Sequence, residues 1–315
     1  MLNAMNRRNF LQLGLTAGAA AVLPRAMSAQ STPAANLAAG PDEAASTPIK
    51  TTKLYDNLYL LQGVGGNLAL QTGHEGNTLI DASYAPAVPR ILEAIAAVSK
   101  DAPFLLINTH WHGDHTGGNE ALHAAGFTIV AHQNTRTRLS TPQTMKMFHR
   151  DVPASPAGAL PTITFDVVMN LYYNGDKLDL IHFAPSHTDT DIYIYFHKAD
   201  VLHLGDIWFN GVYPFIDEGT GGSIGGMIRA AEKALAVAGG ATKIIPGHGL
   251  LGTKADFQKY RDMLATVRDK VATLKSAGAS EHEAVAKKPT AAFDAAWGKG
   301  FMSGDQFTGI VYRTL

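Results

Sequence analysis

The sequence predicts an α/β protein with a four-layer αββα architecture, in which two β-sheets pack face to face and helices cover their outer surfaces. Strand-like and helical segments follow one another as strands, helix, strand, helix, and this order is then repeated along the chain. The 315 residues, 46% of them hydrophobic, can bury a large core, and no cysteine is present to form a disulfide. We therefore expect two similar αβ halves that pack together.

The N-terminal segment is expected to precede the folded domain. Two adjacent arginines, Arg7 and Arg8, stand before an apolar run and a stretch of small residues, which is the pattern of an export signal and looks like the twin-arginine type. We expect residues 1–29 to be a signal peptide that is cleaved near residue 29. Residues 30–50 are rich in Ala, Ser, Thr and Pro and indicate a linker. The domain is then expected to span 51–315 in the periplasm, with the export machinery as a partner.

The first half of the domain is expected to alternate strands with helices. The expected elements are, in order, strands at 53–62, 66–72 and 78–81, a helix at 89–99, a strand at 104–107, a short helix at 119–125 and a strand at 128–131. Residues 133–160 are polar, contain three prolines and follow no period, so we expect a functional lid or insertion there.

The second half is expected to begin with strands alone. The expected elements are strands at 167–173, 178–183, 192–196 and 201–204, an amphipathic helix at 224–238, a strand at 243–245, a long helix at 254–277 and a further helix at 281–287. C-terminal helices are expected to complete the domain.

Four potential metal ligands lie within six residues directly after the strand at 104–107. They are His110, His112, Asp114 and His115. Imidazole nitrogens and carboxylate oxygens suit zinc, and also iron or manganese. In an extended-to-turn segment, His110 and His112 point the same way, whereas Asp114 and His115 reach a second point nearby. The segment can therefore supply two metal ions.

Four further polar residues stand at the ends of predicted strands. They are Asp81, His187, Asp206 and His248. Together with the His-x-His-x-Asp-His run, they give the chain a resemblance to the metallo-β-lactamase-fold hydrolase superfamily. The resemblance covers roughly residues 54–264 with five motifs in the family's order, and it implies the four-layer sandwich.

The resemblance implies a dinuclear zinc centre. The implied ligands of one metal are His110, His112 and His187, those of the other are Asp114, His115 and His248, and the Asp206 carboxylate would bridge the two. Asp81 would orient a ligand loop without touching a metal. The expected cofactor is two Zn²⁺ per chain.

The resemblance also implies hydrolysis. Two divalent ions lower the pKa of bound water to about 7, and a metal-bridging hydroxide would attack a carbonyl-type bond. Asp114 would act as a catalytic residue that orients the hydroxide and shuttles its proton. The chain contains no Gly-x-Ser-x-Gly elbow. We expect an ester, lactone or amide in a small molecule as the substrate.

Aromatic residues close to the motifs in sequence are candidates for a substrate pocket. The candidates are Trp111, Trp208, Phe209 and Tyr213, with Phe215 beside them and His149 as a residue of the 133–160 segment that can close over the site. No Arg or Lys stands beside a motif in the sequence, which favours a neutral or weakly anionic substrate over a nucleotide.

Two other functions stay open within the same fold family. The cysteine-free subclass of β-lactamases resembles this chain in its His-x-His-x-Asp-His run and its exported state. An aspartate at the position of Asp206, however, is typical of glyoxalase II, lactonases, arylsulfatase-like enzymes and organophosphate hydrolases. The second alternative is an iron-dependent sulfur oxygenase. The export signal argues against a cytosolic glutathione-thioester hydrolase.

Charge and hydropathy argue against other classes of partner. The formal net charge is −1, from 26 Lys and Arg against 27 Asp and Glu, and the chain has no basic stripe that would favour nucleic acid. It also has no apolar run of the length that a transmembrane helix needs. We expect a small-molecule substrate, no nucleic acid and no stable membrane insertion.

Overall fold

The computed structural model describes residues 40–183 and 185–315. The expected export signal and most of the expected linker lie outside these residues, so both stay predictions. Within 40–50 the structure places a short helix, α2 (Pro41–Ala44), and β1 already begins at Lys50. Ala44 is buried against the first sheet, so ordered packing starts before residue 51. In the described part of the chain, no helix combines the length and hydrophobicity needed to cross a bilayer.

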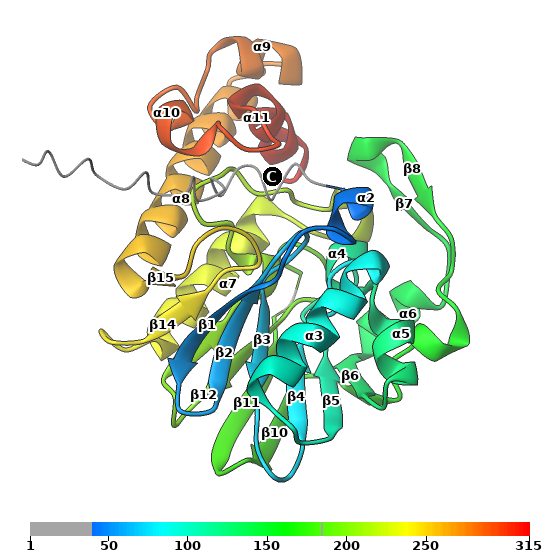
Figure 1. Ribbon diagram of the computed structural model, residues 1–315. Helices are drawn as coiled ribbons and strands as arrows, with labels where there is room; N and C mark the ends of the chain where they lie inside the picture. Colours follow the sequence, from blue (N-terminus) through cyan, green and yellow to red (C-terminus); the bar gives the residue numbers. More distant parts are fainter. Residues whose placement is uncertain (1–39, 184) are drawn as a thin grey trace, which may run out of the picture. The chain divides into compact units, whose positions relative to one another are not determined.

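A seven-stranded sheet forms the first half of the interior (Figure 1), with strand order β1-β2-β3-β4-β5-β6-β9. Its strands are β1 (Lys50–Tyr55), β2 (Leu58–Gln62), β3 (Leu68–Gln71), β4 (Asn77–Ile80), β5 (Pro103–Ile107), β6 (Thr128–His132) and β9 (Ile163–Phe165). The first four strands are antiparallel, and β4, β5, β6 and β9 run parallel to one another.

A six-stranded sheet forms the second half, with strand order β10-β11-β12-β13-β14-β15. Its strands are β10 (Val168–Tyr173), β11 (Asp176–His182), β12 (Ile192–Phe196), β13 (Val201–His203), β14 (Lys243–Ile245) and β15 (Gly252–Thr253). Only β13 and β14 are parallel neighbours. The chain passes from the first sheet to the second through a short exposed connection at Val167, between the edge strands β9 and β10.

Helices accompany both sheets. They are α3 (Val88–Val98), α4 (Gly113–Thr116), α5 (Asn119–Ala124), α6 (Gln133–Leu139), α7 (Ile224–Val237), α8 (Lys254–Ser276), α9 (Glu281–Ala286), α10 (Asp294–Trp297) and α11 (Gly304–Arg313). α3 and α5 pack on the first sheet, and α7, α8 and the C-terminal helices pack beside the second (Figure 1).

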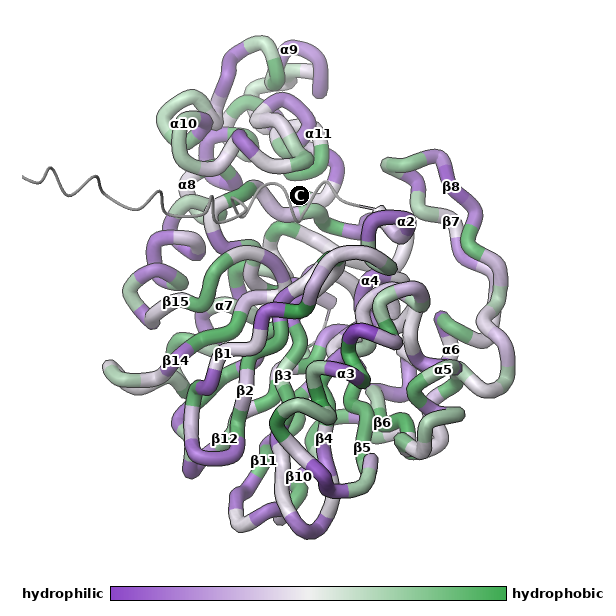
Figure 2. Tube along the Cα trace, viewed as in Figure 1, coloured by the Kyte–Doolittle hydropathy of each residue, from purple (hydrophilic) through white to green (hydrophobic). Residues whose placement is uncertain are grey.

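Three buried clusters confirm the predicted four layers. Side chains alternate between the two faces of a strand, so Leu106 of β5 packs outward against α3 whereas Ile107 packs inward against the second sheet. On the other sheet, Val201 faces inward and Leu202 faces outward toward α7 and α8. β5 accordingly appears as a hydrophobic stretch in Figure 2.

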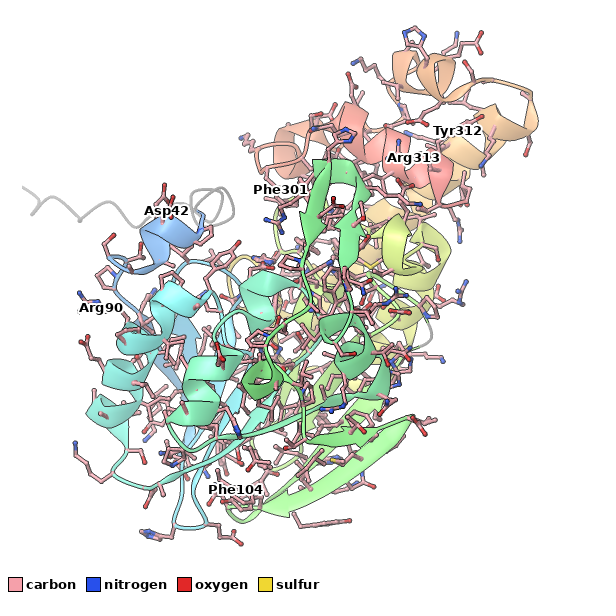
Figure 3. All side chains as sticks on the ribbon, turned by 90° about the vertical axis from the view of Figure 1, so that its right-hand side faces the viewer. Asp42, Arg90, Phe104, Phe301, Tyr312 and Arg313 are labelled. Carbon is pink, nitrogen blue, oxygen red and sulfur yellow. The ribbon has the colours of Figure 1, made fainter. Side chains whose placement is uncertain are left out.

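Some predicted elements differ in detail. The single strand expected at 53–62 is a hairpin of β1 and β2, because the chain turns between Tyr55 and Leu58. The Asn57 side chain in this turn donates a hydrogen bond to the carbonyl of Thr72 at 3.0 Å. Within 133–160 the structure forms α6 and a two-stranded hairpin, β7 (Gln143–Met145) and β8 (Arg150–Val152), rather than patternless chain. Figure 3 shows Phe104 at one end of the strands and Phe301 toward the end where this hairpin lies.

Candidate metal centre

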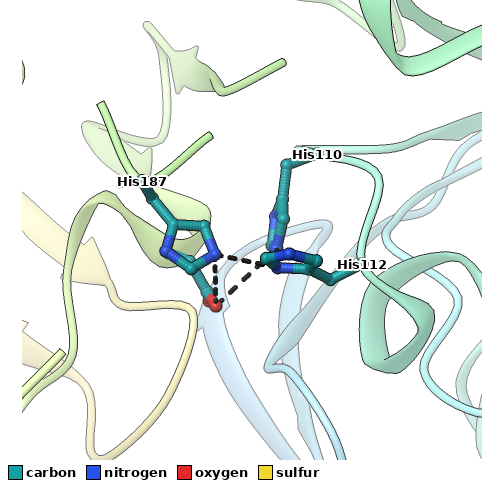
Figure 4. Close-up of side chains that lie close together, drawn as sticks. His110, His112 and His187 are labelled. Atoms are coloured by element: carbon teal, nitrogen blue, oxygen red, sulfur yellow. Dashed lines mark hydrogen bonds and ion pairs between the residues drawn. The ribbon is translucent and has the colours of Figure 1, made fainter. Parts of the chain in front are cut away.

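The seven predicted metal ligands lie together, in two groups whose ligand atoms approach within 4.8 Å of one another. The first group is His110, His112, His187 and Asp206, and the second is Asp114, His115 and His248. Figure 4 shows the three rings of the first group converging. All seven are buried except Asp114, whose side chain is 22% exposed.

The first sheet supplies four of these ligands from one segment. β5 ends at Ile107, and extended backbone carries His110 and His112 as far as α4. The first turn of α4 then reverses the chain and carries Asp114 and His115. The change from extended to helical backbone is what lets neighbouring ligands reach two different points.

The second sheet supplies the other three ligands. His187 lies in the connection between β11 and β12, Asp206 lies in a short 3₁₀ turn (Gly205–Ile207) after β13, and His248 follows β14. Since β13 and β14 are parallel, their carboxyl ends meet at the same edge of the sheet. Asp206 and His248 are therefore neighbours although a helix separates them in sequence.

The four atoms of the first group surround one point. Nδ1 of His112 lies 3.1 Å from Nε2 of His110 and 2.9 Å from Nε2 of His187. Oδ2 of Asp206 lies 3.7 Å from Nε2 of His110 and 3.4 Å from Nε2 of His187.

The second group surrounds another point and shares Asp206. Nε2 of His248 lies 3.4 Å from Nε2 of His115 and 3.1 Å from Oδ2 of Asp114. Oδ1 of Asp206 lies 3.2 Å from Nε2 of His115 and 3.4 Å from Nε2 of His248. Asp206 thus turns one carboxylate oxygen toward each group, which is a bridging arrangement.

These separations fit metal coordination. A tetrahedral zinc ion with nitrogen or oxygen ligands at 2.0–2.2 Å holds neighbouring ligand atoms roughly 3.3 Å apart. Moreover, Oδ1 of Asp206 is buried and accepts no hydrogen bond of good geometry from the described residues, which leaves a lone pair for another ligand. The residues present therefore fit a pair of metal ions.

The electrostatics keep Asp206, His110 and His187 in the form that binds a metal, whereas the two histidines of the second group hold protons in the absence of a metal. Burial alone would raise the pKa of Asp206, but His248 and the other histidines hold it well below its usual range. Burial lowers the pKa of His110 and of His187. For His248, burial alone would lower the pKa, but the carboxylates of Asp206 and Asp114 together raise it to about 9. An ionised carboxylate and neutral imidazoles are the forms that bind metal, so a metal ion at the second group would displace the proton of His248.

Asp81 lies where a supporting residue is expected. It is fully buried at the end of β4, and its carboxylate accepts hydrogen bonds from the backbone N–H of Thr109 at 2.7 Å and from the Thr109 hydroxyl at 2.8 Å. Its Oδ2 also lies 2.7 Å from Nδ1 of His115. This contact fixes the ring so that Nε2 points to the second group.

Asp217 is a supporting residue that the sequence analysis did not identify. Its Oδ2 lies 3.1 Å from Nε2 of His112 and accepts a hydrogen bond from the Thr220 hydroxyl at 2.8 Å. The contact to Nε2 turns Nδ1 of His112 toward the first group. Asp217 stands in a loop without a recognisable motif, so no sequence signal marks it.

A second unpredicted carboxylate shapes the loop that carries His187. Asp191 is buried and accepts hydrogen bonds from the Ser186 hydroxyl at 2.5 Å and from the Thr188 N–H and hydroxyl, both at 2.8 Å. The signal available in the sequence was an acidic residue shortly after a ligand histidine, within a Ser- and Thr-rich loop.

Two glycines allow the ligands to approach this closely. A Cβ on Gly66 would lie 2.2 Å from Cε1 of His115, and a Cβ on Gly247 would lie 1.9 Å from Oδ1 of Asp206. Neither position has room for a side chain. These glycines therefore belong to the site although they bind nothing.

Two of the predicted pocket residues lie in the core instead. Trp208 is fully buried and packs on Phe257 of α8, with 5.1 Å between ring centroids. Tyr213 is fully buried and stacks on Phe307 of α11. Their closeness to Asp206 in sequence was misleading, because the C-terminal helices cover both rings.

The other predicted aromatics lie beside the ligands. The Trp111 ring lies 4.8 Å from that of His112, and its Nε1 donates to the Thr220 hydroxyl at 3.4 Å. Phe209 stacks on His248 with 5.2 Å between centroids. Phe215 lies 5.7 Å from the ring of His112 and equally far from that of His187.

The tip of the β7–β8 hairpin approaches this aromatic group. Phe148 lies in a 3₁₀ turn (Lys146–Phe148) and packs on Phe215, with 5.1 Å between ring centroids, while its own side chain stays largely exposed. His149 follows at the tip in a left-handed conformation with φ of +46° and is exposed. Phe148 rather than His149 makes the contact with the site's aromatic residues.

Comparisons with known proteins agree with this geometry. A family model described as the metallo-beta-lactamase superfamily matches residues 61–252. Among solved structures, the chain is similar to a metallo-beta-lactamase from Pontibacter korlensis, with 18% identity and a TM-score of 0.58 over 69% of this chain and 99% of that one.

Two further solved structures share the fold. One is the DIM-1 metallo-beta-lactamase, with 20% identity and a TM-score of 0.54 over 70% of this chain and 99% of that one. The other is the stereoselective inverting sec-alkylsulfatase Pisa1 from Pseudomonas sp., with 16% identity and a TM-score of 0.64 over 84% of this chain and 50% of that one. At such identities the likeness shows the fold alone.

Proposed function

Because the chain belongs to the metallo-beta-lactamase superfamily, we propose that it is a zinc-dependent hydrolase with two metal ions per chain. The observation that carries the proposal is the pair of buried ligand groups that share the Asp206 carboxylate. Zinc is proposed because ligand sets of nitrogen and oxygen at tetrahedral spacing suit it. The proposed substrate is a small molecule with an ester, lactone or amide bond.

Each ligand has a proposed role. His110, His112 and His187 would hold one ion, Asp114, His115 and His248 the other, and Asp206 would bridge them. When bound, such a pair supplies a water with a pKa near 7 and polarises the carbonyl oxygen of a substrate.

Asp114 is the proposed proton carrier. Its carboxylate is the ligand group with the largest exposed fraction, at 22%. Burial alone would raise its pKa, but the charge of His115 and the hydrogen bond from His248 hold the pKa well below the usual range. The carboxylate is therefore ionised at neutral pH, the form that can accept a hydrogen bond from a metal-bound water and pass its proton on to the leaving group.

The surrounding aromatic rings would orient the substrate and exclude water. Phe209 and Phe215 cover the histidines from one sheet, and Phe148 extends this apolar surface to the solvent side. Phe301 lies 6.3 Å from Phe209 between ring centroids and adds to the same surface. An acyl group with apolar character fits such a wall.

The test is elemental analysis of the purified protein, run beside a panel of aryl esters, lactones, a thioester and a chromogenic cephalosporin. We expect about two zinc ions per chain and turnover of esters or lactones. An Asp206→Ala variant is the matched control, and it should lose metal and turnover together while keeping its far-UV circular dichroism. One iron per chain with no hydrolysis would contradict the proposal and favour the sulfur oxygenase. Cephalosporin turnover above all others would identify a β-lactamase.

Export to the periplasm is proposed on the sequence of residues 1–29 alone. Expression of the full chain followed by cell fractionation and mass spectrometry should find mature protein that begins near residue 30. Replacement of Arg7 and Arg8 by lysine should leave the protein in the cytoplasm if the twin-arginine route carries it.

A further inference from the structure

The β7–β8 hairpin places an arginine beside the metal-ligand segment. Arg150 opens β8, directly after the hairpin tip. A cavity of about 160 Å³ lies between the hairpin and the ligand segment, and Arg150 lines it together with Trp111, Gly113 and Gly117. The guanidinium and the backbone between the metal ligands therefore share one cavity.

Arg150 has no carboxylate partner among the described residues. Its polar contact there is from Nη2 to the sulfur of Met145 at 3.0 Å, and a thioether is a weak acceptor. Arg138, which lines the same cavity, differs, because Asp189 holds it through two hydrogen bonds of 3.1 and 2.6 Å. The N–H donors of the Arg150 guanidinium are therefore available to a ligand, whereas those of Arg138 are paired with the carboxylate of Asp189.

The acidic residue that lines the cavity, Glu120, does not neutralise Arg150. Glu120 makes no ion pair with an arginine in the described part of the chain, and its side chain packs beside Gly158. Burial and the charge of Asp114 raise the pKa of Tyr84, whereas the charge of Arg150 lowers it.

The size of the cavity decides how much of a substrate it can take. Pockets that enclose a whole small ligand usually measure about 300–1,000 Å³, so 160 Å³ suits one end of a molecule. Phe148, at the hairpin tip two residues before Arg150, packs on Phe215 beside the ligand histidines and leaves part of its own ring exposed as an apolar surface. A substrate with a polar end, an apolar middle and a cleavable bond matches the arrangement.

We propose that Arg150 binds an anionic group of the substrate, so that the hydrolase prefers esters or amides with a carboxylate remote from the bond that it cleaves. A guanidinium and a carboxylate form two parallel charge-assisted hydrogen bonds, the strongest pairing open to an exposed arginine. The inference rests on the proposed hydrolytic function, because it assigns a substrate class to the same site. It also gives a cationic residue to a site where the sequence motifs alone indicate none.

The test compares two esters with acyl chains of equal length, para-nitrophenyl butyrate and para-nitrophenyl hemisuccinate, on the zinc-loaded enzyme. The measured quantity is the ratio of kcat/KM for the anionic ester to kcat/KM for the neutral one. Arg150→Gln should lower this ratio by about 10-fold or more, as expected for one lost charge-assisted pair. Arg150→Lys should keep part of the preference for the anionic ester, because lysine keeps the positive charge but cannot form two parallel hydrogen bonds to a carboxylate. Added salt should lower the ratio of the wild type and not that of Arg150→Gln.

Lys146→Gln is the matched control, because it removes a positive charge from the same hairpin at an exposed position that does not line the cavity. Its ratio should equal that of the wild type. If both esters are hydrolysed but Arg150→Gln changes the ratio by less than about twofold, or Lys146→Gln lowers it equally, the inference is overturned and the hydrolase stands. If the zinc-loaded wild type hydrolyses neither ester and nothing else in the panel, the proposed function fails and the inference with it.

Discussion

Gly66 shows how a residue without a side chain controls the chemistry of a site. The ring of His115 occupies the space that a Cβ on Gly66 would fill. Asp81 contacts Nδ1 of the same ring at 2.7 Å, so the ring cannot move away from Gly66 without losing that contact. The position of His115 is therefore fixed by the space beside Gly66 and by the contact with Asp81.

We expect Gly66→Ala to displace His115 and to remove the metal ion of the second group. Activity should fall by about 100-fold or more, since a misplacement of about 1 Å has effects of that size. The measurement is metal content per chain by elemental analysis. Gly113→Ala is the control, because a Cβ at Gly113 meets nothing within 4 Å, and it should retain both ions. Full metal content in Gly66→Ala would disprove the steric argument.

Asp217 allows a second test at the scale of single residues. Asp217→Ala removes the acceptor for Nε2 of His112, so this ring would lose its orientation toward the first group. Changes to such supporting partners typically reduce metal affinity by about 10- to 100-fold. Competition with a chelator should show this loss for one of the two ions. Asp217→Asn keeps an acceptor oxygen and should retain more affinity, and equal affinity in all three proteins would rule out the orienting role.

At the scale of elements, α6, the helix that leads into the β7–β8 hairpin, is held to the loop that carries His187. Arg138, at the end of α6, pairs with Asp189, and Asn134 of α6 donates to the carbonyl of Asp189 at 2.8 Å. The hairpin therefore follows a helix that is anchored beside a metal ligand. Its tip can contact a substrate while its base stays in place.

Phe148→Ala tests the hairpin as a substrate-binding element. Since Phe148 is 45% exposed, its removal should change the free energy of unfolding by about 0.5 kcal/mol or less. KM for esters with large apolar acyl groups should rise severalfold, whereas KM for acetate esters should change little. Val168→Ala, at a similarly exposed position on β10, is the control. A uniform KM across acyl groups in both variants would show that the hairpin does not bind the substrate.

The elements also show how far the sequence could predict this structure. The ligand motifs and the alternation of long strands and helices predicted the four layers, because both depend on local spacing. β9 and β15 have three and two residues, which is too short for a periodic signal. Trp208 was wrongly predicted to line the pocket, because α8, which comes much later in the sequence, packs on its ring and buries it. Asp217 reaches His112 only through tertiary folding, so spacing could not indicate it.

At the scale of the whole molecule, two stacked histidines that belong to neither ligand group join the sheets. His132 ends β6 and His182 ends β11, and their rings stack with centroids 3.6 Å apart. Nδ1 of His132 accepts from the N–H of Asn134, and Nδ1 of His182 donates to the carbonyl of Asp191. Burial lowers the pKa of both rings, which are therefore neutral in the folded protein at neutral pH.

This pair should make stability depend on pH. In the unfolded chain both rings have a pKa near 6.5, so below that pH the unfolded state binds more protons than the folded state. The free energy of unfolding should then fall as the pH drops below about 6.5, until the lowered pKa values of the folded state are reached. Urea denaturation at pH 7.5 and 5.5 measures the free energy of unfolding at each pH. The decrease from pH 7.5 to pH 5.5 should be smaller in His182→Gln than in the wild type. His74→Gln, at an exposed site, should behave like the wild type, and identical losses in all three proteins would contradict the assignment.

The exposed connection at Val167 has a consequence for how the protein can be divided. A cut there leaves each sheet whole, with His110, His112, Asp114 and His115 on one fragment and His187, Asp206 and His248 on the other. Each fragment would expose the inner face of its sheet, and neither would hold a complete ligand group. Co-expressed fragments are therefore expected to reassemble, and zinc should tighten their association because it binds only the assembled form. The same chain, nicked once, would act as a zinc-responsive split reporter.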